Sequence, residues 1–156
     1  SQETDRKIAQ VTEQIGRLGG RLGEFVEGLV APACQTLFAQ RGIPIHRVSQ
    51  RVKARQAGGR HMEIDLLVIN SGVVALVEVK SRLTIEDVQR EMSRLGEFKS
   101  FFPEYADKQI MGAVAGMVVD EAVIHYAIRQ GLFVLVQSGE SVRIANDDAF
   151  VPRTDW

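Results

Sequence analysis

The chain of 156 residues has one cysteine, Cys34, which excludes an internal disulfide framework and any cysteine-rich zinc site. No apolar run approaches the roughly 18 residues that a membrane span requires, so no membrane association is expected. The formal net charge of −1 indicates no class of partner by itself. The start of the chain, residues 1–10, is polar and lacks the apolar centre of a signal peptide. We therefore expect a cytoplasmic protein.

Histidines and aromatic residues are also scarce, and their placement excludes further chemistry. The three histidines, His46, His61 and His125, are scattered and show no His-x-x-x-His spacing, so zinc is not expected. No Ser-His-Asp arrangement for nucleophilic catalysis is apparent either. Aromatic residues make up 6% of the chain, and none lies within residues 41–62, where basic residues gather. Stacking of single-stranded bases is therefore not indicated.

What the chain does contain is an ordinary globular composition, with 45% apolar and 25% charged residues. Apolar residues recur at steps of three or four in residues 3–18 and again in 21–41, which predicts two amphipathic helices. Gly19 and Gly20 should separate them, Pro32 should kink or restart the second, and Gly42 should end it. The first helix either packs on the domain's own core or pairs with a partner chain.

The remaining pattern predicts strands and helices that alternate after an antiparallel start. We expect a strand at 43–55, a hairpin within 63–81, a helix at 84–102, a strand at 110–119, a helix at 120–131, a strand at 132–137 and a short strand at 141–145. This α-β-β-β-α-β-α-β order, after an extra N-terminal helix, predicts an α/β fold with a mixed central sheet and helices on both faces. The expected divisions are 1–19, an amphipathic helix and possible dimerisation arm; 20–145, the domain; and 146–156, an irregular tail.

The hairpin, EIDLLVINSGVVALVEVKS, is apolar except for a few charges at its open end. Ser71-Gly72 is the expected two-residue turn, with a positive φ at the glycine. Counting outward from this turn places Asp65 opposite Glu78 and Glu63 opposite Lys80, with opposed side chains about 5 Å apart at Cβ. On this register Asp65, Glu78 and Lys80 share one side of the sheet.

Two opposed carboxylates in a largely buried sheet repel each other and need compensation. A divalent cation is one solution, since Mg²⁺ is bound by one or two carboxylates while it keeps several waters. A plain ion-pair cluster around Lys80 is the alternative. Such a cluster leaves one negative charge too many, and charges at the end of two apolar strands do not form a solvated face.

Asp65, followed after the turn by Glu-Val-Lys at 78–80, resembles the PD-(D/E)xK nuclease superfamily, which includes restriction endonucleases and archaeal Holliday-junction resolvases. Ile64 stands where many members have proline. The resemblance is to small single-domain members, and it implies a restriction-endonuclease-like core. It also implies that Asp65 and Glu78 bind Mg²⁺ (or Mn²⁺), that the Val79 carbonyl can complete the coordination, and that Lys80 orients or activates the attacking water.

Members of this superfamily often carry a glutamate on the helix before the sheet, in a pattern like G-x-x-x-E. Gly23 and Glu27 match that pattern, and Glu27 is the fourth candidate catalytic residue. Helical geometry independently places Glu27 at the edge of the apolar stripe and Glu24 nearly opposite to it. A boundary carboxylate with its head group in solvent explains Glu27 equally well.

A cluster of basic residues without any acid precedes the Asp65 strand, within residues 41–62. The candidate nucleic-acid-binding residues are Arg47, Arg51, Lys53, Arg55 and Arg60. They could bind phosphates, or they could protect an exposed edge strand, and both can hold together. The sequence thus predicts a Mg²⁺-dependent nuclease, with DNA as the expected substrate and a homodimer as a possible state. The alternative is a non-catalytic nucleic-acid-binding or interaction domain with the same fold.

Overall fold

The computed structural model describes the backbone of residues 1–156 and the side chains of residues 1–8 and 20–156. In this described part, the chain forms an α/β fold with a mixed six-stranded sheet in the order β1-β2-β3-β4-β5-β6. The β3–β4 and β4–β5 pairs are parallel and the others antiparallel. The strands are β1 (Arg47–Arg55), β2 (His61–Ile69), β3 (Val73–Leu83), β4 (Gln109–Val119), β5 (Phe133–Ser138) and β6 (Ser141–Ile144).

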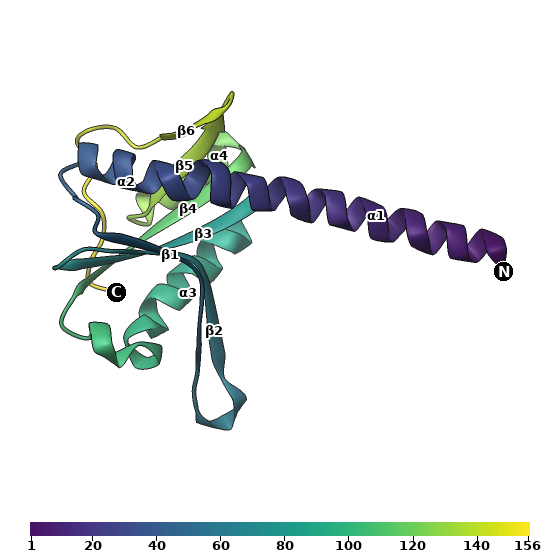
Figure 1. The fold of residues 1–156 in the computed structure, drawn as a ribbon. Helices are drawn as coiled ribbons and strands as arrows, with labels where there is room; N and C mark the ends of the chain where they lie inside the picture. The colour runs from purple at the N-terminus through teal and green to yellow at the C-terminus, as the bar shows by residue number, and fades with distance from the viewer.

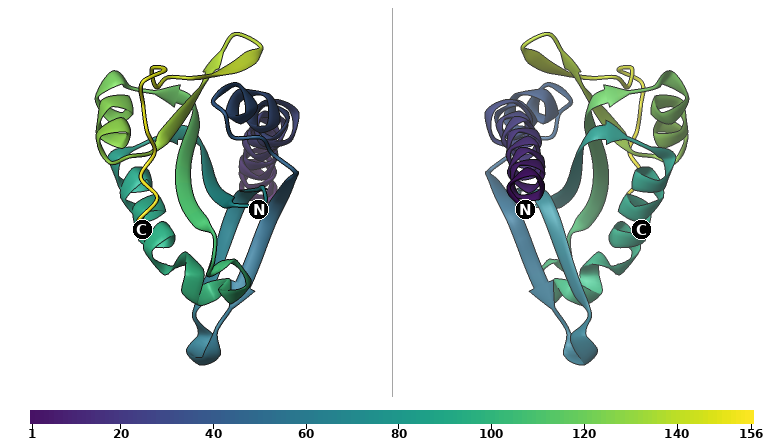
Figure 2. Two further views of the ribbon diagram at one scale, coloured as in Figure 1. Left: turned by 90° about the vertical axis from the view of Figure 1, so that its left-hand side faces the viewer. Right: turned by 90° about the vertical axis from the view of Figure 1, so that its right-hand side faces the viewer.

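Helices cover both faces of this sheet, as predicted. The α-helices are α1 (Gln2–Glu24), α2 (Ala31–Gln40), α3 (Ile85–Phe101) and α4 (Glu121–Arg129). Figure 2 shows α1 and α2 on one side of the sheet and α3 and α4 on the other. Short 3₁₀ turns occupy Ala57–Gly59 and Pro103–Tyr105, and residues 145–156 contain no helix or strand. No helix in the described residues combines the length and apolarity that a membrane crossing needs.

The N-terminal region differs from the prediction of two separate helices. Helix α1 passes through Gly20 and leads directly into a π-helical turn, Phe25–Val30, and then into α2. A glycine costs a helix only about 1 kcal/mol, so Gly19-Gly20 need not end it. Pro32 lies in the first turn of α2, where its missing N–H is tolerated, and the change of helix type occurs just before it. Of the predicted apolar stripe, Val11, Ile15 and Leu18 lie outside the described side chains.

Predicted helix ends are confirmed at two places. Gly42 has φ of 78° and follows α2, where the N–H of Ile43 donates to the Phe38 carbonyl, as in a Schellman motif. Thr84 caps α3 and exchanges hydrogen bonds with Asp87 in a capping box. Burial alone would raise the pKa of Asp87, but hydrogen bonds from Thr84 and Arg90 hold it below its usual value.

The turn of the β2–β3 hairpin lies at Ser71-Gly72, as predicted, but Gly72 does not have a positive φ. Asn70 explains the difference. Its side-chain oxygen accepts hydrogen bonds from the N–H groups of Gly72 and Val73, at 2.8 and 2.7 Å. This side chain closes the turn, so the mirror-image turn that would require a left-handed glycine is not needed.

Two apolar cores lie on the two faces of the sheet. The α3 core lies under α3 and α4 and includes Val88, Leu95 and Phe98, whereas the α2 core lies under α2 and the π-helical turn and includes Phe25 and Phe38. Residues of β2 and β3 contribute to both cores, as expected for strands buried on both faces.

Along β2, the alternation of side chains between the two faces of the sheet is shifted by one residue at Asp65. Leu66 and Val68 belong to the α2 core, but Met62 and Ile64, which have the same parity, belong to the α3 core. Beyond this point β2 leaves β3 and pairs only with β1, and the two strands form an arm that projects from the sheet (Figure 1). The shift in side-chain alternation therefore lies at the boundary between the sheet and the arm, which is also the position of the candidate site.

Candidate functional site

The register on which the site prediction rests is confirmed as far as the ladder extends. Leu66 pairs with Val77 and Ile69 with Val74, which is the register counted from the turn. The ladder ends one pair short of Asp65 and Glu78. There the Asp65 carboxylate accepts a hydrogen bond from the N–H of Val79 at 2.8 Å, and thus takes the place of a backbone partner. Asp65 is held where β2 and β3 separate.

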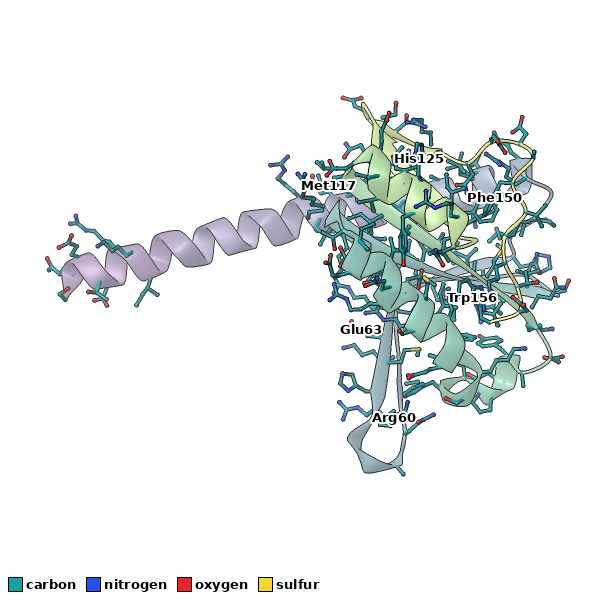
Figure 3. All side chains as sticks on the ribbon, turned by 180° about the vertical axis from the view of Figure 1, so that it is seen from behind. Arg60, Glu63, Met117, His125, Phe150 and Trp156 are labelled. Atoms are coloured by element: carbon teal, nitrogen blue, oxygen red, sulfur yellow. The ribbon has the colours of Figure 1, made fainter. Side chains whose placement is uncertain are left out.

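Glu63 does not lie opposite Lys80, contrary to the sequence-based register. It pairs with Lys53 of β1 and is exposed on the arm, where Figure 3 labels it. The reason is the divergence of β2 from β3, because the hairpin count holds only while the two strands remain paired. Lys80 instead has its Nζ 3.7 Å from Oε1 of Glu78.

Glu78 is the electrostatic centre of the site. Its side chain is 6% exposed, and Oε2 lies 3.2 Å from Nη1 of Arg94, which reaches it from α3. Burial and then the charge of Asp65 raise the pKa of Glu78 from 4.5 to about 7, while Arg94 and Lys80 oppose the rise. The register and the hydrogen bond from the Val79 N–H to Asp65 place the two carboxyl groups at neighbouring positions, and the charge of Asp65 acts on Glu78 accordingly.

Glu91 is a member of this cluster that sequence reasoning did not find. It is 1% exposed, and burial, followed by the charge of Glu78, raises its pKa well above the usual value. Among the described side chains and the backbone, its Oε2 has no hydrogen-bond partner, and neither does Nη1 of Arg94, whose contact with Glu78 is an ion pair. The signal was present, since Glu91 shares the inward face of α3 with Val88 and Leu95.

Asp65 also opens into a pocket of about 150 Å³ between the sheet, the arm and the N-terminal helix. The polar or backbone contributors are Glu27 from the π-helical turn, Gln50 and Arg51 from β1, Asp65 from β2 and Val79 from β3. Leu22, Gly23 and Val26 complete the wall. Glu27 is exposed and lines the same pocket as Asp65 and Val79, whereas Glu78 and Lys80 do not line it.

The residues present suit a hard divalent cation that keeps several waters. The cluster has three acidic residues and two basic ones: Asp65, Glu78 and Glu91 against Lys80 and Arg94. When all of them are ionised, one negative charge is left over. In addition, one carboxylate oxygen of Glu91 has no described hydrogen-bond partner. Two carboxylates and a backbone carbonyl are ligands of the type that Mg²⁺ accepts. No group of three or more His, Cys, Asp or Glu side chains that could enclose an ion occurs among residues 1–8 and 20–156. The donor set thus fits an open site and not a closed one.

The five candidate nucleic-acid-binding residues fall into two groups. Arg60 forms an ion pair with Glu97 at 3.2 Å and lies over the Phe101 ring, so it fastens the arm to α3 (Figure 3). Arg47 lies 3.4 Å from the Tyr105 hydroxyl. The other three, Arg51, Lys53 and Arg55, are exposed on the edge strand β1.

No family model and no curated protein matches this chain. Among solved structures, it is similar to one described as "Crystal Structure of Protein of Unknown Function AF1548". The match has 14% identity and a TM-score of 0.44, and it covers 67% of this chain and 54% of the other. A likeness at this level carries no functional argument, and the matched part spans about half the length of that protein.

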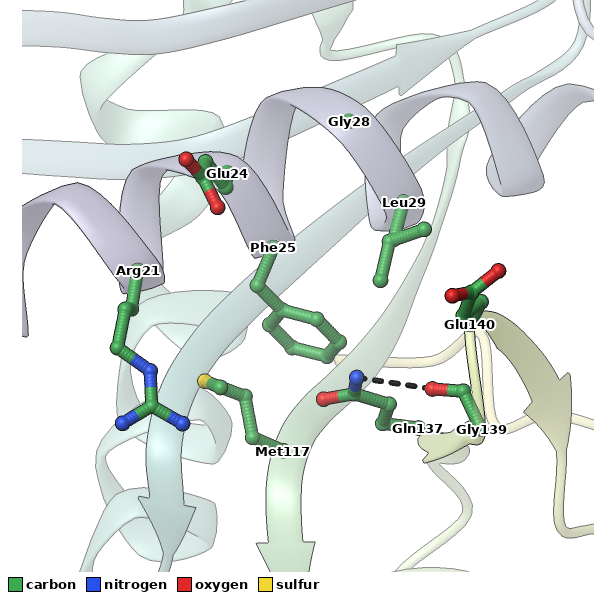
Figure 4. A pocket seen from close by; sticks show the side chains of 9 residues that line it. All are labelled: Arg21, Glu24, Phe25, Gly28, Leu29, Met117, Gln137, Gly139 and Glu140. Atoms are coloured by element: carbon green, nitrogen blue, oxygen red, sulfur yellow. Dashed lines mark hydrogen bonds between the residues drawn. The ribbon is translucent and has the colours of Figure 1, made fainter.

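A larger hollow of about 390 Å³ lies on the other side of the N-terminal helix (Figure 4). Phe25, Leu29 and Met117 form its apolar part, and the Gln137 amide donates to the Gly139 carbonyl at 3.0 Å. Glu24 lines this hollow and not the Asp65 pocket. Cys34 lies in neither, and burial raises the pKa of its thiol to about 12, so it is unreactive at neutral pH.

Proposed function

We propose that this chain is a metal-dependent nuclease of the PD-(D/E)xK type, with a restriction-endonuclease-like arrangement of its core elements. The single observation that carries the proposal is the convergence of Asp65, Glu78 and Lys80 where β2 and β3 separate. The cluster contains three acidic groups and two basic ones, so a bound cation would allow all three carboxyl groups to ionise.

The proposed reaction is hydrolysis of a phosphodiester. Water adds to phosphorus, the bond from phosphorus to the leaving oxygen breaks, and the products are a phosphate monoester and a free hydroxyl. Asp65, Glu78 and the Val79 carbonyl would hold a divalent cation, and the chemistry supplied by such a bound ion is charge neutralisation at the phosphate and a lower pKa for its water.

Lys80 supplies a second positive charge at the reacting centre. Its ammonium group is partly exposed, with 38% of the side chain accessible, and it lies beside Glu78. From there it can hold the attacking water or donate to a phosphate oxygen as negative charge develops. Glu27, on the wall of the Asp65 pocket, can orient a second water.

The surroundings support a nucleic-acid substrate, for which DNA is our proposal. The exposed basic residues Arg51, Lys53 and Arg55 line the arm that begins at Asp65, and they favour binding to a phosphate backbone without base recognition. An intracellular location and a homodimer formed through α1 remain part of the proposal.

The test is cleavage of supercoiled plasmid DNA in Mg²⁺ or Mn²⁺ by the wild-type chain and by Asp65→Asn, Glu78→Gln and Lys80→Met. We expect nicking or linearisation by the wild type and a loss of at least about 100-fold in each variant. Lys99→Met is the matched control, because Lys99 is an exposed lysine of α3 away from the cluster.

Two outcomes would reject the nuclease. Cleavage that survives all three substitutions would come from a contaminant or from another site. Mobility-shift binding without cleavage, at any divalent ion tested, would favour the non-catalytic nucleic-acid-binding domain.

A further inference from the structure

Arg51 has a backbone conformation that its residue type disfavours. Its φ is 52°, and among residues 1–8 and 20–156 it is the one non-glycine residue with a positive φ. For a residue with a Cβ this region is unfavourable, and such conformations cluster at functional sites where the surrounding structure imposes them. Arg51 lies inside strand β1, where a turn gives no reason for it.

This conformation coincides with the break in the sheet at Asp65. Gln50 pairs with Leu66 and Val52 with Ile64, so Arg51 and Asp65 lie across from each other but outside the ladder. The face of β2 changes between Ile64 and Leu66, at the same point. The strained residue therefore belongs to the kink that separates the arm from the sheet and frees Asp65 from strand pairing.

The Arg51 side chain has no structural task that accounts for this strain. It lines the Asp65 pocket and is exposed, and no described side chain forms an ion pair or hydrogen bond with it. Arg60, by contrast, forms an ion pair with Glu97 and a cation–π contact with Phe101. Lys53 and Arg55 line a different hollow farther along the arm.

We propose that Arg51 binds the phosphate at the scissile bond, and that its strained backbone conformation in β1 directs the guanidinium into the Asp65 pocket. The ligand class is a phosphodiester, whose two non-bridging oxygens match the fork of an arginine. Arg51 is thus a catalytic residue that touches the substrate, while Lys53 and Arg55 contact the flanking backbone. This inference rests on the nuclease function proposed above.

The experiment compares Arg51→Ala, Arg51→Gly and Arg51→Lys with Lys53→Ala and Lys53→Gly in the full chain. Steady-state cleavage of a duplex oligonucleotide gives kcat and KM. Both neutral Arg51 variants should lower kcat about 100-fold, with a partial recovery in Arg51→Lys. Lys53→Ala should mainly raise KM and reduce the slope of log affinity against log salt by about 0.9.

Thermal unfolding of Arg51→Gly against the wild type provides a readout that a merely structural arginine would not reproduce, because loss of a structural arginine would lower the Tm. Arg51→Gly should melt about 3 °C above Arg51→Ala, because glycine adopts a positive φ without strain. At Lys53, which is an ordinary strand position, glycine should melt below alanine. An inactive Arg51→Gly enzyme with raised stability would show that the arginine is retained for function.

The possible failures are distinguishable. If the wild type cleaves and Arg51→Ala retains kcat within about threefold, this inference is wrong and the nuclease stands. A wild-type chain that does not cleave would remove the nuclease, and the role of Arg51 with it. If Arg51→Ala and Arg51→Gly melt together, the assignment of the strain to substrate binding is wrong.

Discussion

Arg94 of helix α3 has Nη1 3.2 Å from Oε2 of Glu78, so the most buried acid of the hairpin is neutralised from a different layer of the fold. The contact joins the helix to the sheet at the candidate site. Glu91, three residues earlier on α3, is buried beside them and leaves an oxygen unpaired. Removal of a positive charge from this cluster should therefore destabilise the fold, whereas an added positive charge should stabilise it.

Removal of Arg94 should destabilise the fold because it leaves Glu78 buried without its partner. Arg94→Met is expected to lower the free energy of unfolding at about pH 8 by about 3 kcal/mol, as measured by urea denaturation. Near pH 5 the loss should be smaller, since Glu78, with a pKa of about 7, is then neutral.

Arg82→Met is the control for Arg94→Met. Arg82 forms an ion pair with Asp120 at 3.3 Å, but both side chains are 65% exposed. Its removal should cost less than about 1 kcal/mol. Equal losses in the two variants would show that the Arg94–Glu78 pair is not buried in solution.

The stability of the metal-free chain should fall as pH rises. The pKa of Glu78 is raised from 4.5 to about 7, so between these values the folded state binds more protons than the unfolded state. The contribution of Glu78 to the free energy of unfolding is complete below its pKa in the unfolded state and is lost above its pKa in the folded state. The loss is on the order of 3 kcal/mol. Glu91, whose pKa is also raised, acts in the same direction.

Urea denaturation from about pH 4 to about pH 8 measures this dependence. Glu78→Gln should reduce the slope, because the amide is neutral throughout. Asp87→Asn should not flatten it, since hydrogen bonds lower the pKa of Asp87 and its contribution has the opposite sign. A wild-type profile that rises over this range would contradict the expectation.

Divalent cations should stabilise the folded chain at about pH 8. Binding at one hundred times the dissociation constant adds about 2.7 kcal/mol, which corresponds to a rise of several degrees in Tm. Asp65→Asn should abolish the rise. Asp107→Asn, which changes a carboxylate that is 79% exposed, should preserve it. An unchanged Mg²⁺ effect in Asp65→Asn would place the ion elsewhere.

Gly116 should be needed for the close packing of β4 beside Lys80, with which it pairs. A Cβ there would lie 2.5 Å from Cγ2 of Val119 and 3.2 Å from Cβ of Leu83. Gly116→Ala should therefore lower the free energy of unfolding by about 1–3 kcal/mol. Gly96→Ala on α3, where no atom lies within 4 Å, should instead add up to about 1 kcal/mol. Differential scanning calorimetry of the pair checks both signs.

The hairpin and the helix ends follow from short-range rules, which is why they could be predicted. Turn position determines strand register as long as the strands remain paired, and this brought Asp65 and Glu78 together. Thr84 and Gly42 form their hydrogen bonds with residues close to them in the sequence. The start of α3 and the end of α2 could therefore also be predicted. The single helix through Gly20 was missed, because the cost of glycine in a helix is small enough to be overridden.

The amino-acid sequence by itself determined the element order, the mixed sheet and the hairpin register that ends beside Asp65 and Glu78, since all of these depend on periodicity and on one tight turn. Only the tertiary structure decided that β2 leaves β3 at Asp65, that Arg94 and Glu91 reach Glu78 from α3, and that Arg51 faces Asp65 with a left-handed backbone. These features depend on how distant segments pack in three dimensions, and no local pattern of residues encodes that packing.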